Sequence, residues 1–76
     1  MKIVDIGEPK FNPRSMETEY SIVIRNGEGE IIKSYPIKEC GNLYYLFENE
    51  ESKAKLLFTG SSLEDCRQHI YNILKS

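Results

Sequence analysis

Hydrophobic and polar residues alternate along most of this chain, and the pattern changes to a helical period near its end. In residues 18–25, Tyr20, Ile22 and Ile24 point one way, while Val23 points the other. Similar short apolar runs at 2–6, 30–35, 43–47 and 54–59 predict further strands. The pattern predicts an α+β fold over a single domain, residues 1–76. We expect an antiparallel sheet of four or five strands with one C-terminal amphipathic helix packed on one face. Whether residues 2–6 join the main sheet is left open.

The predicted helix covers residues 62–75 and has a strong start signal. Either Ser61 with Glu64 or Ser62 with Asp65 fits a capping box, in which a hydroxyl accepts the amide of the third helical residue. The apolar positions fall within about 100° of arc at 3.6 residues per turn. These positions are Leu63, Cys66, Ile70, Ile73 and Leu74.

Turn residues divide the rest of the chain. Residues 26–29 predict a hairpin with two alternatives: a type I turn with Gly29 in the left-handed position, or a type I′ turn at Asn26-Gly27. Pro36 is expected to end the third strand, which leaves 37–42 as a connector. Residues 7–15 are expected to form a loop with Phe11 anchored on the core.

Composition narrows the classes of function. The chain has 76 residues and a formal net charge of -2, which argues against a general nucleic-acid binder because such proteins rely on basic surfaces. No signal peptide is recognisable, and no run approaches the roughly 20 apolar residues of a membrane helix. We therefore expect a cytoplasmic protein with no membrane partner, whose two cysteines, Cys40 and Cys66, are reduced.

Candidate chemistry is sparse. Cys66 and His69 lie three residues apart on the helix and could suggest an activated thiol. Cys66, however, lies within the apolar arc, so we expect a buried and inert thiol. No Cys-x-x-Cys pair or second histidine indicates a metal site, and no motif indicates a cofactor. The sequence thus predicts no catalytic, metal or cofactor-binding residues and no enzyme.

The apolar content of the strands suggests an interface. A single helix about 21 Å long covers about half of one face of a five-stranded sheet, yet both faces carry apolar side chains. We therefore expect the second face to bind a partner, since exposed apolar patches often mark such sites. The expected interface residues are Val23, Tyr35, Tyr44, Leu46 and Leu57.

These observations lead to one functional hypothesis and two alternatives. The leading one is a small non-enzymatic module that binds a protein partner or forms a homodimer, of the kind found among accessory or phage-type regulators. The first alternative is a single-stranded nucleic-acid binder that uses tyrosines and cations of the sheet. These residues are Arg25, Lys33, Tyr35, Lys38, Tyr44, Tyr45, Lys53 and Lys55. The more distant alternative is a thiol enzyme built on Cys66 and His69.

Overall fold

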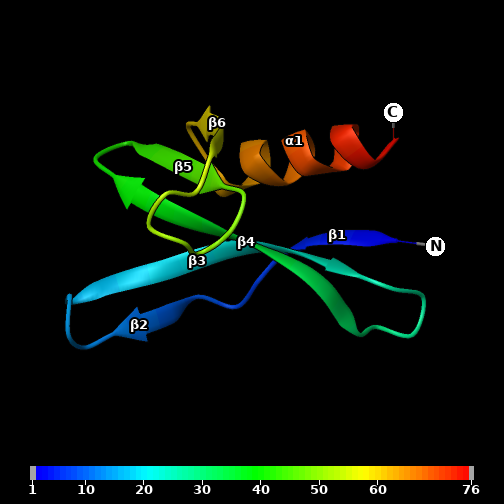
Figure 1. Ribbon diagram of the computed structural model, residues 1–76, viewed down its shortest axis with the longest axis horizontal. Helices are drawn as coiled ribbons and strands as arrows, with labels where there is room; N and C mark the ends of the chain where they lie inside the picture. The colour runs from blue at the N-terminus through cyan, green and yellow to red at the C-terminus, as the bar shows by residue number, and fades with distance from the viewer. Residues whose placement is uncertain (1, 76) are drawn as a thin grey trace.

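The computed structural model describes residues 2–75 and contains a curled antiparallel sheet with one helix packed against it (Figure 1). The main sheet has the strand order β1-β3-β4-β5-β6, and β2 pairs with β3 beside it. This arrangement confirms the predicted fold class. The elements are β1 (Ile3–Ile6), β2 (Lys10–Asn12), β3 (Glu17–Arg25), β4 (Ile31–Cys40), β5 (Leu43–Phe47), β6 (Leu56–Gly60) and α1 (Leu63–Lys75).

The segment before β3 forms an interrupted edge strand. β1 pairs with the second half of β3, so residues 2–6 do join the main sheet, and β2 pairs with the first half. Gly7 lies between the two pairings and donates its amide to the carbonyl of Ser21 at 2.9 Å. A Cβ at this position would lie 2.3 Å from the Ser21 hydroxyl, which explains the glycine. The expected anchoring of Phe11 on the core is wrong, because this side chain is 59% exposed.

β4 continues through Pro36, contrary to the expected strand end there. Because Ser21 directs its carbonyl toward Gly7, its partner Pro36 directs its nitrogen away from β3. Pairing of β4 with β5 starts only at the next residue, Ile37. The missing N–H therefore breaks no ladder bond, and the expected connector 37–42 becomes strand as far as Cys40.

Two of the hairpin turns contain a glycine with a positive φ, each at a different position of the turn. At 26–29 the Gly29 amide donates to the Asn26 carbonyl at 3.0 Å, and Gly29 has a φ of 84°. This geometry matches the type I turn with a left-handed glycine rather than the type I′ alternative. Between β4 and β5, Gly41 occupies the first position of a two-residue turn with a φ of 62°.

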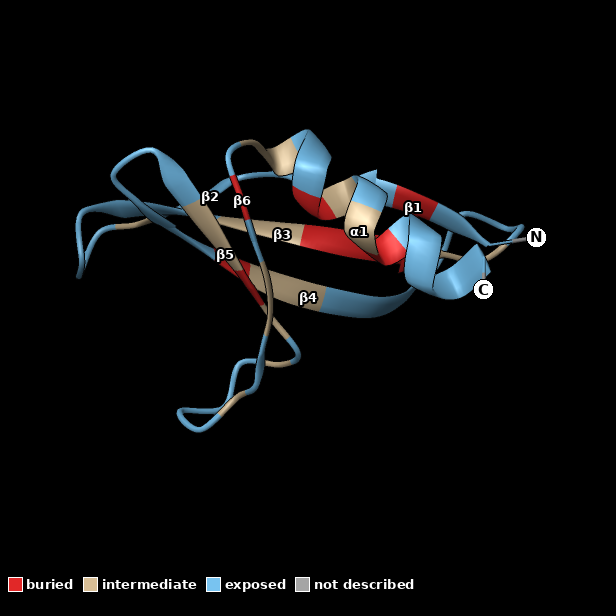
Figure 2. Ribbon diagram, turned by 90° about the horizontal axis from the view of Figure 1, so that it is seen from above, coloured by how far each residue is buried: buried red, intermediate tan, exposed pale blue. Residues whose placement is uncertain are grey.

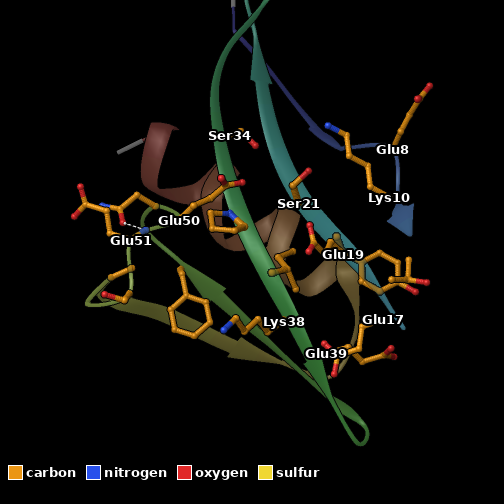
Figure 3. A pocket seen from close by; sticks show the side chains of 18 of the residues that line it. Glu8, Lys10, Glu17, Glu19, Ser21, Ser34, Lys38, Glu39, Glu50 and Glu51 are labelled. Atoms are coloured by element: carbon orange, nitrogen blue, oxygen red, sulfur yellow. Dashed lines mark hydrogen bonds between the residues drawn. The ribbon is translucent and has the colours of Figure 1, made fainter. Parts of the chain in front are cut away.

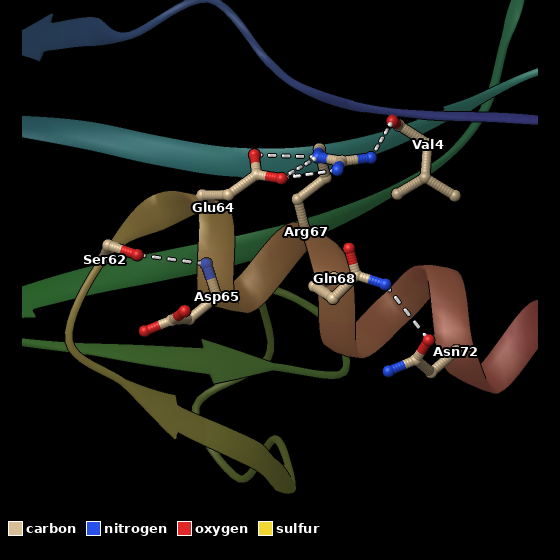
Figure 4. A network of polar contacts seen from close by, with 7 residues as sticks. All are labelled: Val4, Ser62, Glu64, Asp65, Arg67, Gln68 and Asn72. Atoms are coloured by element: carbon tan, nitrogen blue, oxygen red, sulfur yellow. Dashed lines mark hydrogen bonds and ion pairs between the residues drawn. The ribbon is translucent and has the colours of Figure 1, made fainter.

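The helix begins one residue later than the first capping alternative suggested. The Asp65 amide donates to the Ser62 hydroxyl at 3.1 Å, so Ser62 is the cap (Figure 4). Ser61 donates its hydroxyl to the Asp65 carboxylate. Arg67 connects the helix to the sheet. Its guanidinium donates to Glu64 at 2.9 Å and to the Val4 carbonyl of β1 at 3.4 Å.

The core lies between α1 and the face of the sheet that the helix covers (Figure 2). A cross-strand row of side chains from four strands runs beneath the helix, and its members are Tyr20, Ile37, Leu46 and Phe58. Cys66 and Ile70 of the helix are buried against this face, as the helical period predicted. Ile73 and Leu74 were expected in the same arc but are 49% and 38% exposed. The last turn of the helix thus lies beyond the most tightly packed part of the core.

Candidate functional site

The five residues of the expected interface do not form one exposed surface. Leu46 is 0% exposed and belongs to the core, while Val23 lies on the opposite face of the sheet and is 4% exposed. Tyr35, Tyr44 and Leu57 are half-buried and pack against the core. The expectation that Leu46 of β5 lies on the open face of the sheet is therefore wrong. The two-residue turn before β5 aligns Leu46 with Ile37, and this register places Leu46 beneath the helix.

The Cys66 thiol and the His69 imidazole of α1 both pack against neighbouring side chains. Cys66 is 0% exposed, and desolvation raises the pKa of its thiol, with a smaller contribution from the nearby Asp65. His69 stacks on Phe58 of β6, with 4.5 Å between the ring centroids and 15° between the planes. A nucleophilic cysteine requires an accessible thiolate, so this environment gives no support to a thiol enzyme.

Tyrosines and cations of the sheet lie on both of its faces. The ammonium group of Lys33 lies 5.2 Å from the centre of the Tyr35 ring on the helix-covered side. The ammonium group of Lys38 lies 6.0 Å from the centre of the Phe47 ring on the other side. Tyr44 packs edge-on against Tyr20 at 5.9 Å. The pKa of Tyr44 is raised above its ordinary value, mainly by a hydrogen bond with Glu39. These rings and cations therefore do not line up as one platform for successive bases.

Residues 2–75 contain neither a metal-binding cluster nor a membrane-spanning helix. No three histidine, cysteine, aspartate or glutamate side chains are grouped so that they could hold a metal ion. The one helix of this part of the chain is too short and too polar to cross a bilayer.

A groove lies on the side of the sheet away from the helix (Figure 3). It has a volume of about 680 Å³. Its floor consists of Ser21 of β3 with Ser34 and Pro36 of β4. Residues 8–10 and the first half of β3 border the groove on one side, and the 49–54 turn with Phe47 borders it on the other. The groove is open because the cross-strand neighbours on its floor are small.

Divergence of two strands forms one end of the groove. Tyr20 and Ile37 are the last paired residues between β3 and β4. Beyond them, residues 17–19 pair only with β2, and residues 38–40 pair only with β5. Figure 1 shows the β2–β3 and β4–β5 hairpins separating toward the same end of the molecule. The edges of residues 17–19 and 38–40 at this separation therefore have no pairing partner in the described residues.

The groove is strongly acidic. Six glutamates and two lysines line it, which gives a formal charge of -4 against -2 for the whole chain; the remainder of the protein thus carries +2. Figure 3 places Glu17, Glu19 and Glu39 around one end of the groove, and Glu50 and Glu51 across β4 from them. The two ion pairs found in residues 2–75, Arg25–Asp5 and Arg67–Glu64, both lie outside it.

The sequence does contain a pattern that indicates a polar face on this side of the sheet. Glu17, Glu19 and Ser21 alternate with the apolar residues of β3 and occupy its second face, and Ser34, Pro36 and Lys38 do the same on β4. A polar second face argues against a large apolar interface there. The divergence of the two strands, in contrast, has no local sequence signal.

Comparisons with known proteins add no further assignment. No protein-family model, curated protein or solved structure was found that matches this chain.

Proposed function

We propose that this protein is a non-enzymatic binding module that accepts an extended segment of a protein partner in the groove. The observation that carries the proposal is the presence of two strand edges, at 17–19 and 38–40, beside one open concave surface. Addition of a peptide strand to an exposed sheet edge is a common mode of peptide recognition, because the backbone hydrogen bonds supply affinity for many sequences.

The floor of the groove supports this mode. Small side chains at Ser21, Ser34 and Pro36 leave room for a backbone to approach the sheet closely. Phe47 and Met16 add apolar surface at the borders, and Met16 is 74% exposed. A partner segment would thus combine backbone pairing with a few side-chain contacts, which suits weak and reversible binding.

Titration with short extended peptides tests the proposal. We would add eight-residue peptides that alternate threonine with lysine, serine or glutamate to ¹⁵N-labelled protein and follow the amide signals. At least one peptide is expected to shift the signals of residues 17–19 and 38–40 most strongly. The same peptide, N-methylated at alternate residues so that it cannot donate hydrogen bonds along one edge, should bind at least several-fold more weakly.

A pair of variants on neighbouring residues supplies the control. Ser34→Trp would fill the groove, whereas Lys33→Trp places the same ring on the opposite face of β4, and both residues are exposed. Only Ser34→Trp should abolish the shifts. If none of the three peptides shifts these amides, or if Lys33→Trp and Ser34→Trp act alike, the proposed function is wrong.

Self-association is a second candidate that a different edge favours. Residues 31–36 of β4 pair with β3 on one side only, and Ile31 and Ile32 on this segment are 54% and 51% exposed. Two copies could pair through these edges and cover the isoleucines. Sedimentation at increasing concentration would reveal a dimer, and Ile32→Lys should then abolish it. A species that remains monomeric at high concentration would exclude this candidate.

A further inference from the structure

We infer that the segment accepted by the groove is basic, with lysine or arginine at alternate positions of an extended chain. This inference rests on the proposed function and specifies the chemistry of the partner. Three observations carry it: the charge of the groove, the contact between Lys38 and Phe47, and the spacing of the glutamates along β3.

The charge favours a cation over other partners. With six glutamates and two lysines, the groove carries an excess negative charge that neither ion pair of the described residues neutralises. An acidic segment or a phosphate backbone would bring further negative charge into a concave surface, where like charges repel most strongly. A segment with two or more cations would instead relieve this repulsion.

The protein already places one cation on the aromatic surface of the groove. The ammonium group of Lys38 lies 6.0 Å from the centre of the Phe47 ring, and both residues line the groove. A ring face within about 6 Å of a cation attracts it electrostatically. The Lys38 side chain is exposed and flexible, so a guanidinium or ammonium group of the partner could take its place on Phe47.

The spacing of the acids specifies the pattern of the segment. Glu17 and Glu19 are two residues apart on β3, and their side chains lie on the same face, as strand geometry requires. Alternate residues of a paired extended chain also share one face, with a repeat of about 6.7 Å. Cations at alternate positions therefore face both glutamates together, whereas cations at consecutive positions point to opposite sides.

Binding of matched peptides tests the inference. Fluorescence anisotropy would compare the alternating lysine–threonine peptide with its serine and glutamate counterparts. A fourth peptide would carry the same four lysines in one block followed by four threonines. The alternating basic peptide is expected to bind best, with an affinity that falls by about tenfold as screening increases from low to high salt. The block peptide, equal in charge, should bind several-fold more weakly.

Two variants of equal charge locate the effect. Glu17→Gln with Glu19→Gln should reduce the affinity for the basic peptide by about three- to tenfold. Glu28→Gln with Glu30→Gln, in the distant β3–β4 turn, changes the net charge equally and should have little effect.

The results separate this inference from the proposed function. If the serine or glutamate peptide binds at the groove as well as the basic one, the module still binds segments, but the inferred charge preference is wrong. If the block peptide binds as well as the alternating one, or if both double variants act alike, the attraction is a general one and the inferred pattern is wrong. If no peptide shifts the amides at 17–19 and 38–40, both the inference and the proposed function fail.

Discussion

Leu46 offers the sharpest test of the packing described above. Its side chain is 0% exposed and lies in the cross-strand row between Ile37 and Phe58. Leu46→Ala removes three buried carbon groups, which at about 0.8 kcal/mol each accounts for a loss of about 2.4 kcal/mol. The cavity left beneath the helix adds to this, so we expect a total loss of about 3 kcal/mol.

Urea denaturation followed by circular dichroism would measure the effect. A domain of this size has a total stability of about 4–11 kcal/mol, so the variant should fold but with a much lower midpoint. With a slope of about 1 kcal/mol per molar urea, the midpoint should fall by about 3 M. Leu46→Glu should leave the chain unfolded, because it would bury a carboxylate without a partner.

Leu56→Ala is the matched control, because it removes the same atoms from the adjacent strand. Leu56 pairs with Phe47 but is 46% exposed, so its truncation should cost about 1 kcal/mol or less. Equal losses for the two variants, or a loss below about 1 kcal/mol at Leu46, would refute the assignment of Leu46 to the core. A folded Leu46→Glu variant would refute it as well.

Three further predictions concern the helix. Ser62→Ala should lower the free energy of unfolding by about 1 kcal/mol, and by more than Ser61→Ala, because Ser62 is the residue that accepts the Asp65 amide; equal effects in chemical denaturation would contradict this. Native Cys66 should react slowly with a thiol reagent, because it is buried and its pKa is raised, and exposed Cys40 should react fast; mass spectrometry of each labelled peptide distinguishes them. The hydrogen bond with Arg67 lowers the pKa of Glu64, so the stabilisation exists above the ordinary pKa of a glutamate and is lost as the pH falls through the lowered value. The melting temperatures of wild type and Glu64→Gln should therefore differ at pH 7 and converge at pH 2, and a difference that persists in acid would argue against this ion pair.

The parts of the fold predicted well from the sequence depend on interactions within a few residues. The helix start offered two capping pairs, and the hydrogen bond from the Asp65 amide to Ser62 selects the second. The turn at 26–29 offered two types, and the left-handed Gly29 matches the first. In each case the sequence limited the alternatives to two, because the partners are local.

The parts predicted poorly depend on how distant strands pair. Pro36 stands within β4 because the orientation of Ser21 and the late start of β5 leave its missing N–H without consequence. Leu46 was expected on the open face but lies in the core. A strand has two equivalent faces until its register is known, and the turn at Gly41 establishes that register across β4.

The candidate site could not be predicted for a related reason. Glu17 and Glu19 are ordinary residues of a polar strand face in the sequence, and they gain significance only where β3 and β4 separate. That separation arises because β4 pairs with β3 as far as Ile37, whereas its residues 38–40 pair only with β5. This change of partner depends on pairings between residues up to 17 positions apart, such as Tyr20 with Ile37, which hydrophobic periodicity does not report.

The same exchange of partners accounts for the apparent excess of apolar surface in the strands. By curling, the sheet brings β5 and β6 toward one helix, so that Leu46 and Phe58 share a core with Ile22 instead of extending a flat face beyond it. The face left open is then polar and small, which removes the need for an apolar partner. Binding there would rely on backbone pairing and on charge, and salt would weaken the contribution of the charges. A salt-sensitive and sequence-tolerant interaction is thus the kind that this curled sheet favours, and the salt titration of the alternating peptide measures that property directly.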